Sequence, residues 1–148
     1  LYLSNNLIAS IPDDTFLQLK NLNNLYLNNN FLNQMPNIRD LNALYILDLS
    51  NNRLRSISSF QFENLRTLWQ LNLENNLIET IESNAFKNLV NLNSLIIRNN
   101  FLSELPQLTN LHRLNSLDLS NQNGNLKILP DFSFERNSPE ITSSSSDQ

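Results

Sequence analysis

Hydrophobic residues return along this chain in one short phrase that recurs at nearly constant intervals. The phrase begins at Leu1, Leu25, Leu47, Leu71, Leu95 and Leu117, so that successive starts lie 24, 22, 24, 24 and 22 residues apart. It reads LYLSNNLI, LYLNNNFL, LDLSNNRL, LNLENNLI, LIIRNNFL and finally LDLSNQNG. Apolar residues alternate with others inside the phrase, as Leu25 and Leu27 do around Tyr26, and this period of two predicts a short strand with one buried face. The sequence therefore predicts one strand per repeat in a chain of stacked repeats.

Further apolar positions extend each repeat beyond its strand. A leucine three residues before the strand leucine is expected to point inward in each repeat, at Leu22, Leu44, Leu68, Leu92 and Leu114. The 24-residue repeats place Phe16, Phe62 and Phe86 at one shared offset, which predicts an aromatic column. The 22-residue repeats lack this residue and are expected to close more tightly, through Ile38 with Leu41 and Leu108 with Leu111.

This pattern resembles the leucine-rich repeat, LxxLxLxxNxLxxL, over about residues 1–134. The resemblance implies an α/β leucine-rich-repeat solenoid. It would be a right-handed curved coil, with short parallel strands on the concave face and mostly irregular or short helical segments on the convex face. The phrase IESNAFKNLVNL, from Ile81 to Leu92, is similar to the typical repeat of extracellular animal proteins. The order of long and short repeats resembles that of small leucine-rich proteoglycans.

The family's asparagine position is occupied in five repeats, by Asn6, Asn30, Asn52, Asn76 and Asn100. The resemblance implies that these residues form a structural ladder. In such a ladder, each buried side-chain amide hydrogen bonds the backbone of its own turn and that of the next coil.

The last repeat departs from the template. Leu126, Leu129 and Phe134 each stand two residues later than expected, which indicates an insertion around Gln122–Asn125, and the single glycine, Gly124, would suit a turn there. The ladder asparagine is displaced or lost in this repeat, and Asn137 replaces the next expected inward leucine. We therefore predict a solenoid over residues 1–134 and a flexible tail or linker over 135–148. Because Leu1 already lies inside a repeat, we also expect this chain to be a piece of a longer protein.

Charge and composition disfavour several classes of function. The net charge of the 148 residues is −4, with acidic and basic residues interspersed, which argues against nucleic acid as a partner. No apolar run approaches the roughly 20 residues that span a bilayer, so no membrane insertion is expected within this segment. The chain contains no cysteine, one histidine (His112) and one glycine, so we predict no disulfide, metal site, cofactor or catalytic centre. The sequence thus predicts that this protein is not an enzyme.

Outward strand positions on the concave face are the first candidates for binding a partner. They include Tyr2, Tyr26, Asn28, Asp48, Asn72, Glu74, Ile96, Arg98 and Asp118. Tyrosine is enriched at interfaces, although such residues can also serve only to solvate a sheet. A second candidate is the rim strip, defined as the apolar residues that directly follow the ladder asparagines: Leu7, Phe31, Leu77 and Phe101, interrupted by Arg53. The alternative for the strip is that neighbouring side chains half-bury each other. Trp69 is expected to pack where the convex segment enters the strand.

The sequence therefore predicts a protein-protein interaction module that holds a protein ligand on its concave face. The extracellular type of repeat favours a fragment of a secreted or cell-surface protein, such as an extracellular matrix component or a receptor. The alternatives are a cytoplasmic scaffold or regulatory subunit that positions an enzyme, and a spacer inside a longer solenoid. Oligomeric state stays open.

Overall fold

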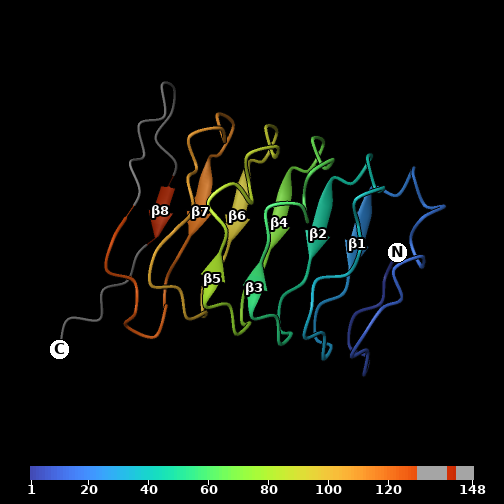
Figure 1. The fold of residues 1–148 in the computed structure, drawn as a ribbon, viewed down its shortest axis with the longest axis horizontal. Coiled ribbons are helices and arrows are strands. Elements are labelled where there is room, and N and C mark those ends of the chain that lie inside the picture. Colours follow the sequence, from blue (N-terminus) through green and yellow to red (C-terminus); the bar gives the residue numbers. More distant parts are fainter. Residues whose placement is uncertain (130–139, 143–148) are drawn as a thin grey trace.

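A computed structural model describes residues 1–129 and 140–142, and the chain winds through them in coils that stack side by side (Figure 1). Each coil after the first adds one strand to a six-stranded sheet with the order β1-β2-β4-β6-β7-β8, and every pairing is parallel. The strands are β1 (Asn24–Tyr26), β2 (Ile46–Asp48), β4 (Gln70–Asn72), β6 (Ser94–Ile96), β7 (Ser116–Asp118) and β8 (Glu140–Thr142). The predicted repeat starts pair directly, as Leu25 does with Leu47 and Leu47 with Leu71. The prediction of stacked single-strand repeats is confirmed.

The two ends of the sheet differ from the central coils. The first coil makes an isolated parallel bridge from Tyr2 to Tyr26. At the other end, β8 pairs with β7 and places Ile141 beside Leu117, within the segment predicted to be a tail. The predicted boundary at 134 and the rest of that segment lie outside the described residues.

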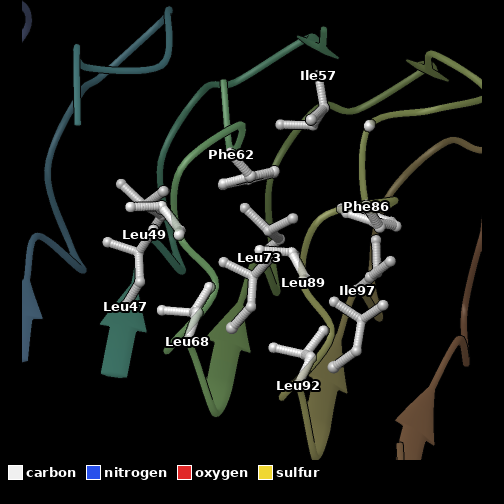
Figure 2. Packing of buried hydrophobic residues seen from close by; sticks show 14 of the residues in the cluster. Leu47, Leu49, Ile57, Phe62, Leu68, Leu73, Phe86, Leu89, Leu92 and Ile97 are labelled. Carbon is white, nitrogen blue, oxygen red and sulfur yellow. The ribbon is translucent and has the colours of Figure 1, made fainter. Parts of the chain in front are cut away.

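The core lies between the strands and the opposite side of each coil, which we call the turn side. Strand leucines such as Leu25, Leu47 and Leu71 are fully buried, while the residues on either side of them are half-buried. Figure 2 shows Leu68 and Leu92 close to the strands, with Phe62 and Phe86 farther out toward the turn side. Alternating strand residues and the inward residues of the turn side thus fill one continuous core.

The turn side contains turns and irregular segments, and no helix is found in residues 1–129 and 140–142. The irregular convex segments are as predicted, but the short helices and the α/β class are not observed. The reason lies in the spacing of the inward residues, because Phe16, Leu19 and Leu22 recur every three residues. Separate backbone hydrogen bonds that span three residues fit this period, such as Leu19 N to Phe16 O at 3.0 Å and Leu22 N to Leu19 O at 2.9 Å.

The predicted aromatic column is present only as a pair. Phe16, Phe62 and Phe86 are all buried, and the rings of Phe62 and Phe86 pack at 5.9 Å between centroids. Phe16 is separated from Phe62 by the shorter coil that starts at Leu25. That coil has no aromatic residue at this position, and closes through buried Ile38 and Leu41 as predicted.

A second, two-stranded parallel sheet joins two neighbouring coils on the side opposite the large sheet (Figure 1). It consists of β3 (Ser56–Ile57) and β5 (Thr80–Ile81), and Glu82 N donates to Ile57 O at 2.9 Å. Proline occupies the position of Glu82 in three other coils, at Pro12, Pro36 and Pro106. Because proline has no N–H, those coils cannot donate this hydrogen bond, and the second sheet is confined to the two coils without proline.

Four of the five predicted asparagines form a hydrogen-bonded ladder, which runs in the direction opposite to the predicted one. The Asn76 amide donates to Leu73 O of its own turn at 3.1 Å and to Leu49 O of the preceding coil at 3.0 Å. Its carbonyl oxygen accepts from Leu54 N, also in the preceding coil, at 3.0 Å. Asn30, Asn52 and Asn100 are buried and make equivalent bonds, so each ladder residue completes the coil before it.

The ladder changes its chemistry at both ends. Asn6 is exposed and bonds only within its own turn, to Leu3 O and Ser4 O. Gln122 takes the last position, where its amide donates to Ile97 O at 3.0 Å and its carbonyl accepts from Leu102 N at 3.2 Å. The ladder therefore continues into the last repeat, where the sequence predicts that its asparagine is displaced or lost. Gln122 fills the position because glutamine carries the same amide on a longer side chain.

The asparagine that precedes each ladder residue adopts a left-handed backbone conformation, with φ of 59° at Asn5, 56° at Asn29, 55° at Asn51, 52° at Asn75 and 56° at both Asn99 and Asn121. Among residues other than glycine, asparagine adopts this conformation at comparatively low cost. The side chains also link coils, since Asn75 Nδ2 donates to Asn51 Oδ1 at 2.9 Å. In the central repeats, the first asparagine of each pair therefore forms the left-handed turn, and the second bonds the preceding coil.

Substitution of Asn75 is expected to separate backbone strain from the loss of its side chain. Asn75→Gly and Asn75→Ala both lose the amide contact with Asn51, but only glycine adopts a φ of 52° freely. We expect the alanine variant to be less stable than the glycine variant by about 1 kcal/mol. Urea unfolding of the two variants measures this difference, and equal midpoints would exclude the backbone explanation.

Candidate functional site

The strand face presents three rows of outward side chains across neighbouring coils, and the predicted binding residues lie in two of them, the middle row and one flanking row. We use this name for the outward residues of the large sheet and for the residue that follows each strand by two positions. The middle row consists of Tyr26, Asp48, Asn72, Ile96 and Asp118, which are paired in register. The flanking row includes Asn28, Ser50, Glu74, Arg98 and Ser120. The structure thus brings the predicted binding residues together on one face.

Two stacked tyrosines stand at one end of the strand face. The rings of Tyr2 and Tyr26 lie 4.8 Å apart between centroids and are tilted by only 8°. Next to them, Ser4 Oγ donates to Asn28 Oδ1 at 2.5 Å. Tyr2 remains 77% exposed despite the stack, so a flat aromatic surface is available to a partner.

A small ionic cluster stands toward the other end of the strand face. Arg98 Nη2 lies 2.7 Å from Glu74 Oε1, and Arg98 Nε lies 3.9 Å from Asp118 Oδ2. The hydrogen bond with Glu74, followed by the negative charge of Glu74 and a smaller contribution from Asp118, raises the pKa of Arg98 above its usual value. The side chain of Arg98 is held in place but still exposed, which presents an oriented cation between two carboxylates.

The two aspartates of the middle row are partly committed to the protein itself. Asp48 Oδ1 accepts from the backbone N–H of Ser50 at 2.9 Å and from its hydroxyl at 2.7 Å. Asp118 makes the same pair of bonds with Ser120, at 3.1 Å and 2.7 Å. Each carboxylate is therefore fixed in orientation by its own turn.

The rim strip is not a continuous apolar surface. Leu7 is 82% exposed, Phe31 and Phe101 are each 37% exposed, and Leu77 is half-buried. The guanidinium of Arg53 lies over the ring of Phe31, 4.5 Å from its centroid, and interrupts the strip. Leu77 is therefore partly buried and Arg53 covers one face of Phe31, while Leu7 stays exposed.

A groove that is not predicted from the sequence lies where the turn side enters the strands. This strand-entry groove has a volume of about 680 Å³, and its lining includes Tyr45, Trp69, Asn93, His112 and Arg113. Trp69 lies at the entry to the strand, as the sequence predicts, and it stacks on Tyr45, but both rings remain more than one third exposed. The available signal is that Tyr45, Trp69 and Asn93 each directly precede a strand.

Features of metal sites and membrane spans are not found in residues 1–129 and 140–142. In that part of the chain, no cluster of three or more His, Cys, Asp or Glu side chains is arranged to hold a metal ion. His112 is exposed on the wall of the strand-entry groove. The same residues contain no helix with the length and hydrophobicity needed to cross a membrane.

Comparison with known proteins supports a common architecture. A family model described as "Leucine rich repeat" matches residues 1–54 and 42–102. Among solved structures, 57 chains match, including one from the "Crystal structure of LRIM1/APL1C complex". That chain is 21% identical with a TM-score of 0.75, a likeness that covers 95% of this chain and 27% of the solved one. At this identity the likeness concerns the fold alone, and this chain spans about a quarter of the solved chain's length. No curated protein sequence matches.

Proposed function

This chain belongs to the leucine-rich repeat family, and on that premise we propose that it is a binding module that holds a protein partner on its strand face. Modules of this family generally mediate protein-protein interactions, and the solved structure that shares the fold is described as a complex. We propose binding as the role of this chain in place of catalysis. The chain would then act through the shape and charge of its surface.

The pre-ordered strand face is the observation that carries this proposal. Glu74 and Asp118 hold Arg98, Ser50 and Ser120 hold the two aspartates, and Tyr2 stacks on Tyr26. A side chain that is fixed before binding loses less conformational entropy when a partner arrives. Aromatic and arginine side chains are also the residue types most enriched among binding hot spots. A folded protein surface with its own charged groups suits this arrangement.

Site-specific photo-crosslinking tests the assignment of the face. A photoreactive amino acid replaces Asn72, in the middle row of the strand face, or Lys20, which is exposed on the turn side. We expect a discrete crosslinked species from position 72. An excess of the protein without the photoreactive residue should suppress it. Crosslinking of the same species from position 20 alone would place the partner on the turn side and overturn the proposal.

The double substitution Tyr26→Ala with Glu74→Gln is expected to weaken partner binding by about thirtyfold or more. Two hot-spot side chains each contribute more than about 1 kcal/mol, and about 2 kcal/mol corresponds to a thirtyfold change. Phe60→Ala with Glu63→Gln is the matched control, since both residues are exposed on the turn side. Titration calorimetry with the crosslinked partner compares the two variants. Equal affinities would remove the strand face as the binding site.

We further propose that the protein is secreted or displayed at the cell surface. The similarity of Ile81–Leu92 to extracellular repeats supports this location. Protease treatment of intact cells that express the full-length protein is the test, together with analysis of their medium. Protein found only inside protected cells would favour the cytoplasmic scaffold instead.

A further inference from the structure

The strand-entry groove is built on a column of residues that stack from coil to coil. Trp69 N donates to Tyr45 O at 2.9 Å, Asn93 N donates to Trp69 O at 2.9 Å, and Asn115 N donates to Asn93 O at 2.8 Å. These backbone groups satisfy one another, so an extended peptide cannot add to this edge as a further strand. Recognition in the groove must therefore depend on side chains.

One face of the Trp69 ring is stacked on Tyr45, and the side chain as a whole is 37% exposed where it lines the groove. The two rings lie 5.6 Å apart between centroids, with 12° between the ring planes. Tyr45 belongs to the coil on one side of Trp69, and Thr67 belongs to the same coil as Trp69. The other groove residues, including Asn93 and Arg113, belong to coils on the other side. The groove therefore lies beside the face of Trp69 that Tyr45 does not cover, and the exposed part of the indole there is a surface suited to a flat, weakly polar ring.

Two asparagines present fixed hydrogen-bond acceptors beside this face. Asn91 Nδ2 donates to Arg66 O at 2.7 Å, and Asn93 Nδ2 donates to Arg113 O at 3.1 Å. These bonds orient each amide, and among the described residues neither Oδ1 atom has a hydrogen-bond donor. Carbonyl oxygens held this way accept from the hydroxyl or amide groups of a ligand at little entropic cost.

The charge of the groove is opposite to that of the chain as a whole. His112 and Arg113 line it, no carboxylate does, and the net charge of the chain is −4. Within the described residues, Arg113 has no carboxylate within salt-bridge distance, in contrast to Arg98 on the strand face. An anionic group on a ligand would therefore find an uncommitted guanidinium.

From these three features we propose that the strand-entry groove binds an acidic oligosaccharide. The apolar C–H face of one sugar ring packs on Trp69, hydroxyl groups donate to Asn91 and Asn93, and a carboxylate or sulfate pairs with Arg113. A saccharide satisfies all three features at once, since each ring combines an apolar face with a rim of hydroxyl donors. This site is separate from the proposed protein-binding strand face.

The single tryptophan makes this site directly observable, because all tryptophan emission comes from Trp69. The acidic probe is a tetrasaccharide of alternating glucuronic acid and N-acetylglucosamine. The neutral probe is the N-acetylglucosamine tetrasaccharide, and the peptide probe is a hexapeptide of alternating glutamate and glycine. We expect the acidic tetrasaccharide to change the emission saturably with a Kd of about 1 mM or below. We expect the peptide to bind at least tenfold more weakly.

Arg113→Gln tests the role of the charge. Arg113 is exposed and its side chain supports no bond of the fold, so this variant retains the structure. We expect about five- to tenfold weaker binding of the acidic tetrasaccharide and unchanged binding of the neutral one. Lys20→Gln is the matched loss of an exposed cation outside the groove, and it should leave both affinities as they are.

Three outcomes would overturn the proposal. The first is that neither saccharide changes the Trp69 emission saturably at concentrations up to about 20 mM. The second is equal or tighter binding of the peptide, which would assign the groove to an acidic protein segment. The third is an equal effect of Lys20→Gln and Arg113→Gln, which would indicate nonspecific charge attraction. Because the strand face is assayed separately by crosslinking at position 72, failure here leaves the proposed function intact.

Discussion

Asn76→Ala is expected to destabilise the protein by about 3–4 kcal/mol, which would place it among the most damaging single changes in the chain. The Asn76 side chain is 3% exposed and bonds Leu54 N, Leu49 O and Leu73 O. Alanine leaves the buried Leu54 N–H without an acceptor, which costs about 1–3 kcal/mol, and it removes two further hydrogen bonds that contribute about 1 kcal/mol each. Urea unfolding followed by circular dichroism measures the loss.

Asn6→Ala is the matched control for this prediction. Asn6 stands at the same position of its coil, but it is exposed and bonds only its own turn. Water replaces such bonds, so we expect a loss of less than about 1 kcal/mol. If Asn76→Ala and Asn6→Ala had equal effects, burial and contact with the preceding coil would not be the source of the ladder's stability.

Phe86→Ala should cost about 3–5 kcal/mol, because it empties a fully buried aromatic site in the middle of the core. The loss includes packing against the ring of Phe62, which is worth about 0.5–1.5 kcal/mol beyond burial alone. A double-mutant cycle with Phe62→Ala isolates this coupling. Phe60→Ala removes a ring of the same size that is 55% exposed, and it should cost less than about 1 kcal/mol.

Phe16→Ala extends the comparison. Phe16 is 2% exposed but has no ring contact with Phe62, because a coil without an aromatic at this offset lies between them. Its coupling with Phe62→Ala should be close to zero. A coupling as large as that of the Phe62 and Phe86 pair would mean that the cavity relaxes across several coils.

The sequence predicts the strands well because their signal is local and repeated. Every strand leucine from Leu25 to Leu117 is buried and paired in the expected register. The expectation of helices on the turn side comes from the family resemblance and not from these residues. The three-residue spacing of Phe62, Leu65 and Leu68 already favours turns over a helix with 3.6 residues per turn.

Other differences also have signals in the sequence. Ile141 follows Leu117 by 24 residues, which is the longer repeat interval, and β8 forms there. The prolines at 12, 36 and 106 show which coils cannot join the second sheet. The direction of the ladder could not be predicted, because an amide at this position can reach either neighbouring coil.

Of the candidate surfaces, the outward rows of the strand face could be predicted from the sequence, whereas the strand-entry groove could not. The period of two is sufficient to assign Tyr26, Asp48 and Asn72 to one outward row, and their register in the sheet agrees with it. The strand-entry groove could not be predicted, because residues that precede the strands follow no repeated hydrophobic pattern. Its shape depends on how the large ring of Trp69 lies beside the smaller Asn93, which is a matter of side-chain conformation across coils.

The direction of the ladder has a consequence for synthesis on the ribosome. Leu54 N lacks its acceptor until Asn76 is translated 22 residues later, and Ile78 N lacks its own for equally long, until Asn100 follows. At about 5–20 residues per second, this delay is roughly 1–4 s for each coil. The nascent chain therefore always carries one unfinished coil at its growing end, and a pause in translation would leave that coil exposed to chaperones or to the wrong neighbour.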